Sequence, residues 1–245
     1  MNSENAYMRA IPIEKHFVEL NSILRKLAIL FLLFCIIWSS VSHHVISGWL
    51  ELLHIQNSPN NGDLFVYSPF DWLGVRWSTI LLLSLISVLP FASIQIYLFS
   101  RIGLIPRERT WLTVVLISST AAIPLIIVLV WILGLPVLFD VAEAAGTIDG
   151  VGVRYDAASV FSIALGASWI MAIWSLTAIT LSLTRVLGLV ELGSTRMRLR
   201  FLAISAGLLV LTLPVEYDGL RLLTAIIVTY TADAISRKTP TIHFV

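Results

Sequence analysis

One acidic residue stands inside an arginine-rich segment between two apolar runs. Glu108 is flanked by Arg107 and Arg109 and follows the apolar run that ends at Phe99. A second acid, Glu19, precedes the first apolar run of the chain. A carboxylate near a membrane surface binds an arginine guanidinium through two hydrogen bonds, and the lower dielectric constant there strengthens the pair. Glu19 and Glu108 are therefore candidates for a site that binds paired guanidinium groups, unless each is a solvated acid that balances nearby arginines.

Other residue sets offer little catalytic or metal-binding chemistry. His43 and His44 are adjacent, so they point to different faces of a helix, and no acid or cysteine lies at ligand spacing. His16 and Glu19 share a helix face, but no matching pair occurs elsewhere. The glycine-rich segment 146–152 follows no strand and precedes no lysine, so it does not predict a phosphate-binding loop. The sequence predicts no enzyme, no metal site and no cofactor.

The composition places the chain in a lipid bilayer. Of its 245 residues, 58% are hydrophobic and 13% are charged, and the mean hydropathy is +0.90. A soluble domain carries about 25% charged residues. The net charge of +1 gives no field that would attract nucleic acid. We therefore expect one integral membrane domain over residues 1–245.

The apolar runs predict an all-α fold of six transmembrane helices. A hydrocarbon core of about 30 Å needs about 20 helical residues. The expected spans cover about 24–46, 77–99, 111–139, 157–184, 201–213 and 219–235, between tails 1–15 and 236–245. The fifth and sixth spans are shorter than the bilayer requires, so they form either a buried re-entrant hairpin or a place where the bilayer thins. The tryptophans near span ends are expected to be interfacial anchors, namely Trp49, Trp72, Trp77 and Trp111.

The basic residues indicate the orientation of the helices. With six spans, both termini and two basic loops share one side of the membrane, and 13 of the 16 Lys and Arg residues lie there. Only Arg76, Arg154 and Arg221 lie on the other side. Positively charged loops stay on the cytoplasmic side. We therefore expect a multi-pass protein of the plasma membrane with both termini in the cytoplasm.

The first acid lies in a segment that resembles a family motif. Residues 16–23 read His-Phe-Val-Glu-Leu-Asn-Ser-Ile. This segment resembles the cytoplasmic opening of the TatC family, the large membrane subunit of the twin-arginine protein translocase, which reads His-Leu-x-Glu-Leu-Arg-x-Arg. Glu19 keeps the acid, whereas Asn21 and Ile23 replace the two arginines.

The resemblance continues to about residue 236 and has no gap up to Pro136. It includes a proline and an aromatic residue in the second span, the basic-acid-basic loop, a late proline in the third span, and a proline-and-acid turn between the short spans. The matching residues are Pro90, Gln95, Phe99, Glu108, Pro136, Pro214 and Asp218. The acid that the family carries in its fourth span is missing, and Leu176 falls about there.

The resemblance implies a role in the Sec-independent translocation of folded proteins. Glu19, Glu108 and Phe99 would bind twin-arginine signal peptides, while Pro90, Gln95, Pro136, Pro214 and Asp218 would shape the scaffold and its partner surfaces. Small single-span Tat subunits would dock on the two short spans, and the protein would assemble with further copies of itself.

Two other functions remain open from the sequence. A non-catalytic membrane assembly subunit would account for the replaced arginines at Asn21 and Ile23. A small-molecule permease would line a path with polar groups such as Ser84 and Thr177. The chain lacks the internal repeats of many carriers and the acids that they commonly hold inside their spans.

Overall fold

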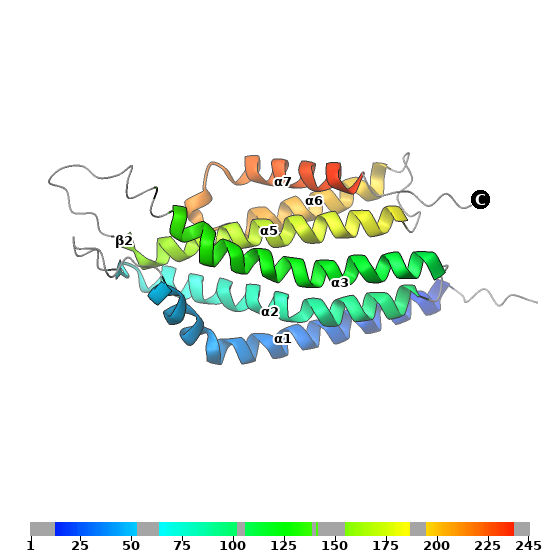
Figure 1. Ribbon diagram of the computed structural model, residues 1–245, viewed down its shortest axis with the longest axis horizontal. Helices are drawn as coiled ribbons and strands as arrows, with labels where there is room; N and C mark the ends of the chain where they lie inside the picture. The colour runs from blue at the N-terminus through cyan, green and yellow to red at the C-terminus, as the bar shows by residue number, and fades with distance from the viewer. Residues whose placement is uncertain are drawn as a thin grey trace, which may run out of the picture.

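The computed structural model describes residues 13–52, 64–101, 106–138, 141, 155–186 and 195–237, which form a bundle of long helices (Figure 1). The helices are α1 (Ile13–Leu52), α2 (Pro69–Ser100), α3 (Pro106–Leu129), α5 (Ala157–Val186), α6 (Thr195–Thr212) and α7 (Arg221–Ser236). A π-helical stretch, η2 (Val130–Gly134), continues α3, and a 3₁₀ turn, η3 (Val215–Tyr217), joins α6 to α7. Two short strands, β1 (Leu64–Phe65) and β2 (Tyr155–Asp156), pair in parallel.

Four helices are long and apolar enough to cross a membrane, and these segments are Val18–Leu50, Pro69–Ser100, Arg109–Leu138 and Ala157–Arg185. They correspond to the first four predicted spans and confirm the helical membrane class. The helices α6 and α7 have 18 and 16 residues. At a rise of about 1.5 Å per residue they measure about 27 and 24 Å, less than a hydrocarbon core of about 30 Å. The count of six crossings stays a prediction.

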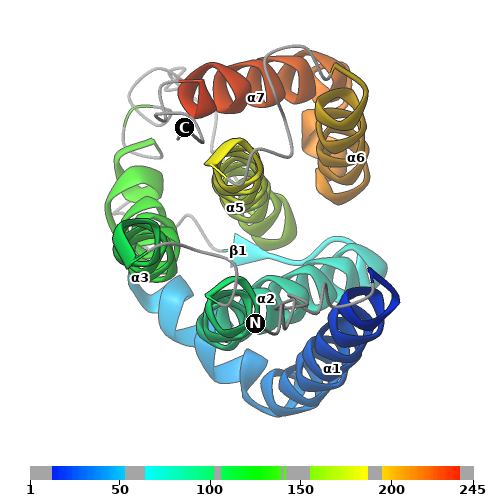
Figure 2. The same cartoon turned by 90° about the vertical axis from the view of Figure 1, so that its right-hand side faces the viewer.

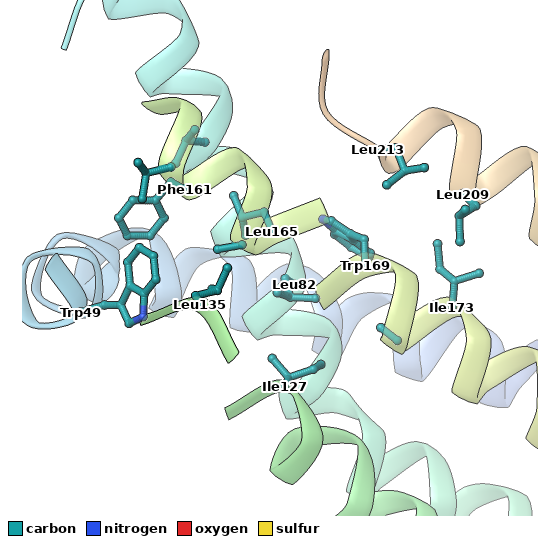
Figure 3. Close-up of a cluster of buried hydrophobic side chains, with 14 of the residues drawn as sticks. Trp49, Leu82, Ile127, Leu135, Phe161, Leu165, Trp169, Ile173, Leu209 and Leu213 are labelled. Carbon is teal, nitrogen blue, oxygen red and sulfur yellow. The ribbon is translucent and has the colours of Figure 1, made fainter. Parts of the chain in front are cut away.

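The centre of the bundle is α5. It packs against α2, α3, α6 and α7, and Figure 2 shows it enclosed by these helices. In the most apolar 18-residue window of α5, 61% of the residues are buried, against none in the corresponding window of α1. Figure 3 shows how apolar side chains of α5 meet those of its neighbours, and the labelled residues are Trp49, Leu82, Ile127, Leu135, Phe161, Leu165, Trp169, Ile173, Leu209 and Leu213. This helix therefore fixes the positions of the others.

In the described residues, two helix starts carry side-chain caps. The hydroxyl of Ser68 accepts a hydrogen bond from the Asp71 amide at 3.3 Å, and Pro69 occupies the first turn of α2. Before α5, a carboxylate oxygen of Asp156 accepts hydrogen bonds from the Ser159 amide at 3.0 Å and the Ser159 hydroxyl at 2.8 Å. Burial alone would raise the pKa of Asp156, but these hydrogen bonds hold it below its ordinary value. Each cap satisfies amides that the first helical turn leaves without partners.

The interfacial role predicted for Trp49 is wrong, because this side chain lies in the core. Trp49 is 5% exposed, and its ring lies 4.5 Å from Phe161 and 5.0 Å from Trp131. Trp72 packs against the same cluster. Trp77 is 54% exposed, as an anchor in lipid headgroups would be.

Candidate functional site

The residues predicted to bind a ligand lie at one end of the bundle. At this end α1, α3 and α6 begin and α2, α5 and α7 end (Figure 1). Glu19 lies in the second turn of α1, and its side chain is exposed. Glu108 lies in the first turn of α3, and its side chain is outside the described part of the structure. Phe99, the residue before the last one of α2, is half-buried.

The two acids lie on helices that flank α2. This helix packs against both α1 and α3, and Figure 2 shows its end between theirs. A ligand that reached both acids would therefore lie across the end of α2, next to Phe99. The structure brings Glu19, Glu108 and Phe99 to the same end, and their part in binding stays a prediction.

Neutral contacts hold α1, α2 and α3 together behind this end. The indole of Trp38 donates a hydrogen bond to the Ser87 hydroxyl at 2.9 Å, and the hydroxyls of Ser93 and Thr120 lie 2.6 Å apart. Pro90, between these contacts, is exposed on α2 and leaves one carbonyl of the helix without its usual amide donor. Gln95 is half-buried on the same helix. Pro90 and Gln95, the predicted scaffold residues of the second span, thus lie near the hydrogen bonds that join α1, α2 and α3.

Pro136 has a specific structural role at the opposite end. In η2 the amide of Leu135 donates a hydrogen bond to the carbonyl of Val130, five residues before it. In the same pattern the Trp131 carbonyl would accept a hydrogen bond from the amide at position 136, which is Pro136. Proline has no N–H to donate. The indole of Trp49 supplies the missing hydrogen bond to the Trp131 carbonyl at 3.0 Å. The π-helical stretch and the proline therefore create the acceptor that ties α1 to α3.

The turn between α6 and α7 holds Pro214 and Asp218. Pro214 precedes η3, and Asp218, which follows it, pairs with Arg221 at 2.9 Å. Gly219 has φ +84°, a left-handed conformation that favours glycine. Tyr217 anchors the turn on α5, because its hydroxyl donates a hydrogen bond to the Ile163 carbonyl at 2.9 Å. Burial, and then the charge of Glu216, raise the pKa of Tyr217.

A buried ion cluster was not foreseen from the sequence. Asp233, on the last turn of α7, is 2% exposed and pairs with Arg185 of α5, Arg198 of α6 and Arg237 at the end of α7. Arg198 binds both carboxylate oxygens, with its Nε 2.8 Å from Oδ1. Removing one partner of a buried ion pair typically costs about 3–5 kcal/mol. The cluster therefore joins three helices at the end that holds Glu19.

Only part of this cluster has a signal in the sequence. Asp233 and Arg237 are four residues apart at the end of an apolar run, the spacing of an ion pair on one helix. Arg185 and Arg198 lie at the ends of two other runs, and no local pattern assigns them to Asp233. At the position where the resemblance expects an acid, Leu176 is half-buried. Near it, the indole of Trp174 donates a hydrogen bond to the Thr231 hydroxyl at 3.1 Å and links α5 to α7.

Comparisons with known proteins give one family and one fold. A family model described as "Sec-independent protein translocase protein (TatC)" matches residues 15–215. A solved structure described as "Crystal Structure of Twin Arginine Translocase Receptor- TatC" has a TM-score of 0.63 and 18% sequence identity, covering 91% of this chain and 96% of that chain. Another, described as the same receptor in DDM, has a TM-score of 0.62 and 20% identity, covering 92% and 99%. No curated protein sequence matches the chain significantly.

Proposed function

This chain belongs to the TatC family, and from that premise we propose that it is the membrane receptor for twin-arginine signal peptides and the scaffold of a translocase for folded proteins. Its membership makes it a membrane subunit of the Sec-independent protein translocase. Both solved structures that it resembles are described as twin-arginine translocase receptors. The proposed receptor activity is supported by this chain's own residues.

The arrangement of Glu19, Glu108 and Phe99 at one end of the bundle carries the proposal. A twin-arginine signal peptide presents two permanent cations followed by an apolar stretch. Each guanidinium matches a carboxylate in a planar, bidentate geometry that lysine cannot reproduce. With its arginines at Glu19 and Glu108, such a peptide would cross the end of α2. Its apolar stretch would then lie beside Phe99.

Two features of the chain predict unequal roles for the acids. Asn21 and Ile23 stand where the family motif has arginines, so Glu19 lacks the neighbours that would orient it. Glu108 keeps Arg107 and Arg109 on either side. We therefore assign the larger share of the binding free energy to Glu108.

The short helices support the scaffold role. The outward face of α7 is strongly apolar, and its exposed residues include Leu222 at 71%, Ile226 at 65% and Tyr230 at 70%. An apolar face on helices of about 24–27 Å suits either thinned lipid or the single helix of a partner subunit. In our proposal α6 and α7 cross the membrane as the fifth and sixth spans and dock small single-span Tat subunits. Both termini lie in the cytoplasm, and the protein is in the plasma membrane.

The test is the crosslinking of a twin-arginine signal peptide to the purified protein, comparing wild type with Glu108→Gln and Glu19→Gln. Glutamine keeps the shape of the side chain and removes its charge. A charged hydrogen bond contributes about 1.5–3 kcal/mol, so Glu108→Gln should weaken the complex about 10- to 150-fold. We expect a smaller loss for Glu19→Gln. Glu216→Gln, exposed in the turn at the opposite end, is the matched control and should bind as wild type does.

The replaced residues favour one other function. Asn21, Ile23 and Leu176 each replace a charged residue that the family pattern carries, as a subunit that only stabilises the assembly would allow. Equal crosslinking in wild type and both site variants would falsify the receptor role and support the assembly role. A peptide without its two arginines tests the same point from the ligand's side, since a receptor must bind it more weakly.

A further inference from the structure

The Asp233 cluster contains more positive charge than its own carboxylate balances. Three arginines carry three positive charges and Asp233 carries one negative charge, so the net charge is +2. The carboxyl ends of α5 and α7 add negative partial charge and the amino end of α6 adds positive, about −0.5 in sum. Among the described residues, more than one positive charge therefore remains at a place where Asp233 and Arg185 are almost entirely buried.

The hydrogen bonds of the cluster are also unbalanced. The two oxygens of Asp233 accept five N–H bonds, from Arg185, Arg198 and Arg237. An ionised carboxylate offers about four lone-pair sites, so Asp233 has no capacity left. The Nε atom of Arg185 is buried and has no hydrogen-bond partner in the described part of the chain. Buried donors without a partner are rare, and a charged one points to a missing acceptor.

Exposed apolar residues lie in the same helical turns as the arginines. Leu199 follows Arg198 in α6 and is 62% exposed, and Ile235 lies two residues before Arg237 and is 45% exposed. The arginine side chains lie at the ends of three apolar helices, at the level of lipid headgroups if these helices cross the membrane. A ligand that fits has an anionic, multiply accepting headgroup and hydrocarbon chains.

We propose that the Asp233 cluster binds the phosphate group of an anionic phospholipid, with the acyl chains on the exposed apolar surface of α6 and α7. Phosphate oxygens are the acceptors that match arginine best. Inorganic phosphate shares this chemistry but has no apolar part, so it should bind much more weakly. The proposal is independent of signal-peptide binding, which involves other helices.

The experiment titrates the full-length protein in dodecyl maltoside with phosphatidylglycerol, phosphatidylcholine or inorganic phosphate, and reads bound lipid by native mass spectrometry. Wild type should retain phosphatidylglycerol in preference to phosphatidylcholine. Arg237→Gln should weaken its binding about tenfold or more, the effect of losing one charged hydrogen bond. Arg237 is half exposed, so this variant should fold. Arg200→Gln, an exposed arginine of α6 outside the cluster, is the control and should bind as wild type does.

Asp233→Asn distinguishes an anion-binding site from an ion cluster that only stabilises the fold. Removing the carboxylate charge of Asp233 should leave phosphatidylglycerol binding unchanged or make it tighter. If the cluster only stabilises the fold, the variant should show a lower Tm and no specific lipid binding. If Asp233→Asn does not fold, the pair Arg237→Gln and Arg200→Gln decides. Equal retention in wild type and Arg237→Gln, or an equal loss in Arg200→Gln, overturns the proposal. Competition by inorganic phosphate at the same concentration as phosphatidylglycerol overturns the lipid assignment.

Discussion

The contact between Gly166 and Tyr217 makes the strongest prediction about the scaffold. Gly166 lies on the central helix α5, directly under the ring that anchors the α6–α7 turn. A Cβ atom at this position would lie 2.2 Å from Cε2, 2.7 Å from Cζ and 2.9 Å from the hydroxyl oxygen of Tyr217. The ring cannot stay where it is in a Gly166→Ala variant, and its hydrogen bond to the Ile163 carbonyl must break.

The expected cost follows from three contributions. Overpacking a well-filled site typically costs about 1–3 kcal/mol, and losing a neutral hydrogen bond costs about 0.5–1.5 kcal/mol. Alanine is better than glycine inside a helix by about 1 kcal/mol, which offsets part of this. Gly166→Ala should therefore lower the free energy of unfolding by about 0.5–3.5 kcal/mol. The α6–α7 turn should become more accessible to protease.

Unfolding in mixed micelles, followed by circular dichroism, measures the effect. Gly207→Ala is the matched control, because it is also inside a helix and, apart from the backbone of its own helical turn, no atom lies within 4 Å of the added Cβ. It should be neutral or stabilising by up to about 1 kcal/mol. In a Tyr217→Ala background the space is empty, so Gly166→Ala should lose its cost. Equal destabilisation by Gly166→Ala in both backgrounds would show that Tyr217 is not the cause.

Three further predictions concern the same end of the bundle and the topology. Trp49→Phe leaves the Trp131 carbonyl without a hydrogen-bond donor and should lower the free energy of unfolding by about 1–3 kcal/mol. Adding Pro136→Ala supplies a backbone N–H and should recover part of this loss. If the second substitution recovers nothing, the role given to the proline is refuted. Because Asp156 has a lowered pKa in the folded state, its charge stabilises the fold above about pH 4 and loses this effect as the pH falls through the lowered value. Asp156→Asn should therefore be less stable than wild type by about 0.5–1 kcal/mol at pH 7 and equal to it in acid, whereas a difference that persists in acid would point to packing. Reporter tags at the carboxyl terminus and in the connection between α3 and α5 should lie on opposite sides of the membrane, and a carboxyl terminus labelled from outside intact cells would contradict the six-span topology.

The sequence predicted the four long helices well because membrane burial leaves a strong signal. Long runs of apolar residues have no other stable place, so hydropathy alone locates them. The helix α1 extends over Ile13–Leu52, beyond the expected span of 24–46 at both ends. The added turns at the amino end contain polar residues, which a helix tolerates outside the hydrocarbon core but a hydropathy window excludes.

The packing of these helices could not be predicted, because apolar helices have no distinct buried face. Trp49 looks like an interfacial residue in the sequence, and only its contacts with Phe161 and Trp131 place it in the core. The partners of Asp233 lie 35 and 48 residues away in α6 and α5. Local spacing cannot distinguish them from any other arginine at a helix end.

Neutral hydrogen-bonded pairs connect the long helices to one another. The indoles of tryptophans donate hydrogen bonds to serine or threonine hydroxyls on neighbouring helices at 2.6–3.1 Å, and the pairs are Trp38–Ser87, Trp131–Ser168, Trp169–Ser78 and Trp174–Thr231. Hydrogen bonds between membrane helices contribute about 0.6 kcal/mol each, so the four add about 2–3 kcal/mol without burying a charge. None of these side chains titrates near neutral pH. The described acids Glu19, Asp156 and Asp233 instead lie toward the two ends of the helices, away from their apolar middles.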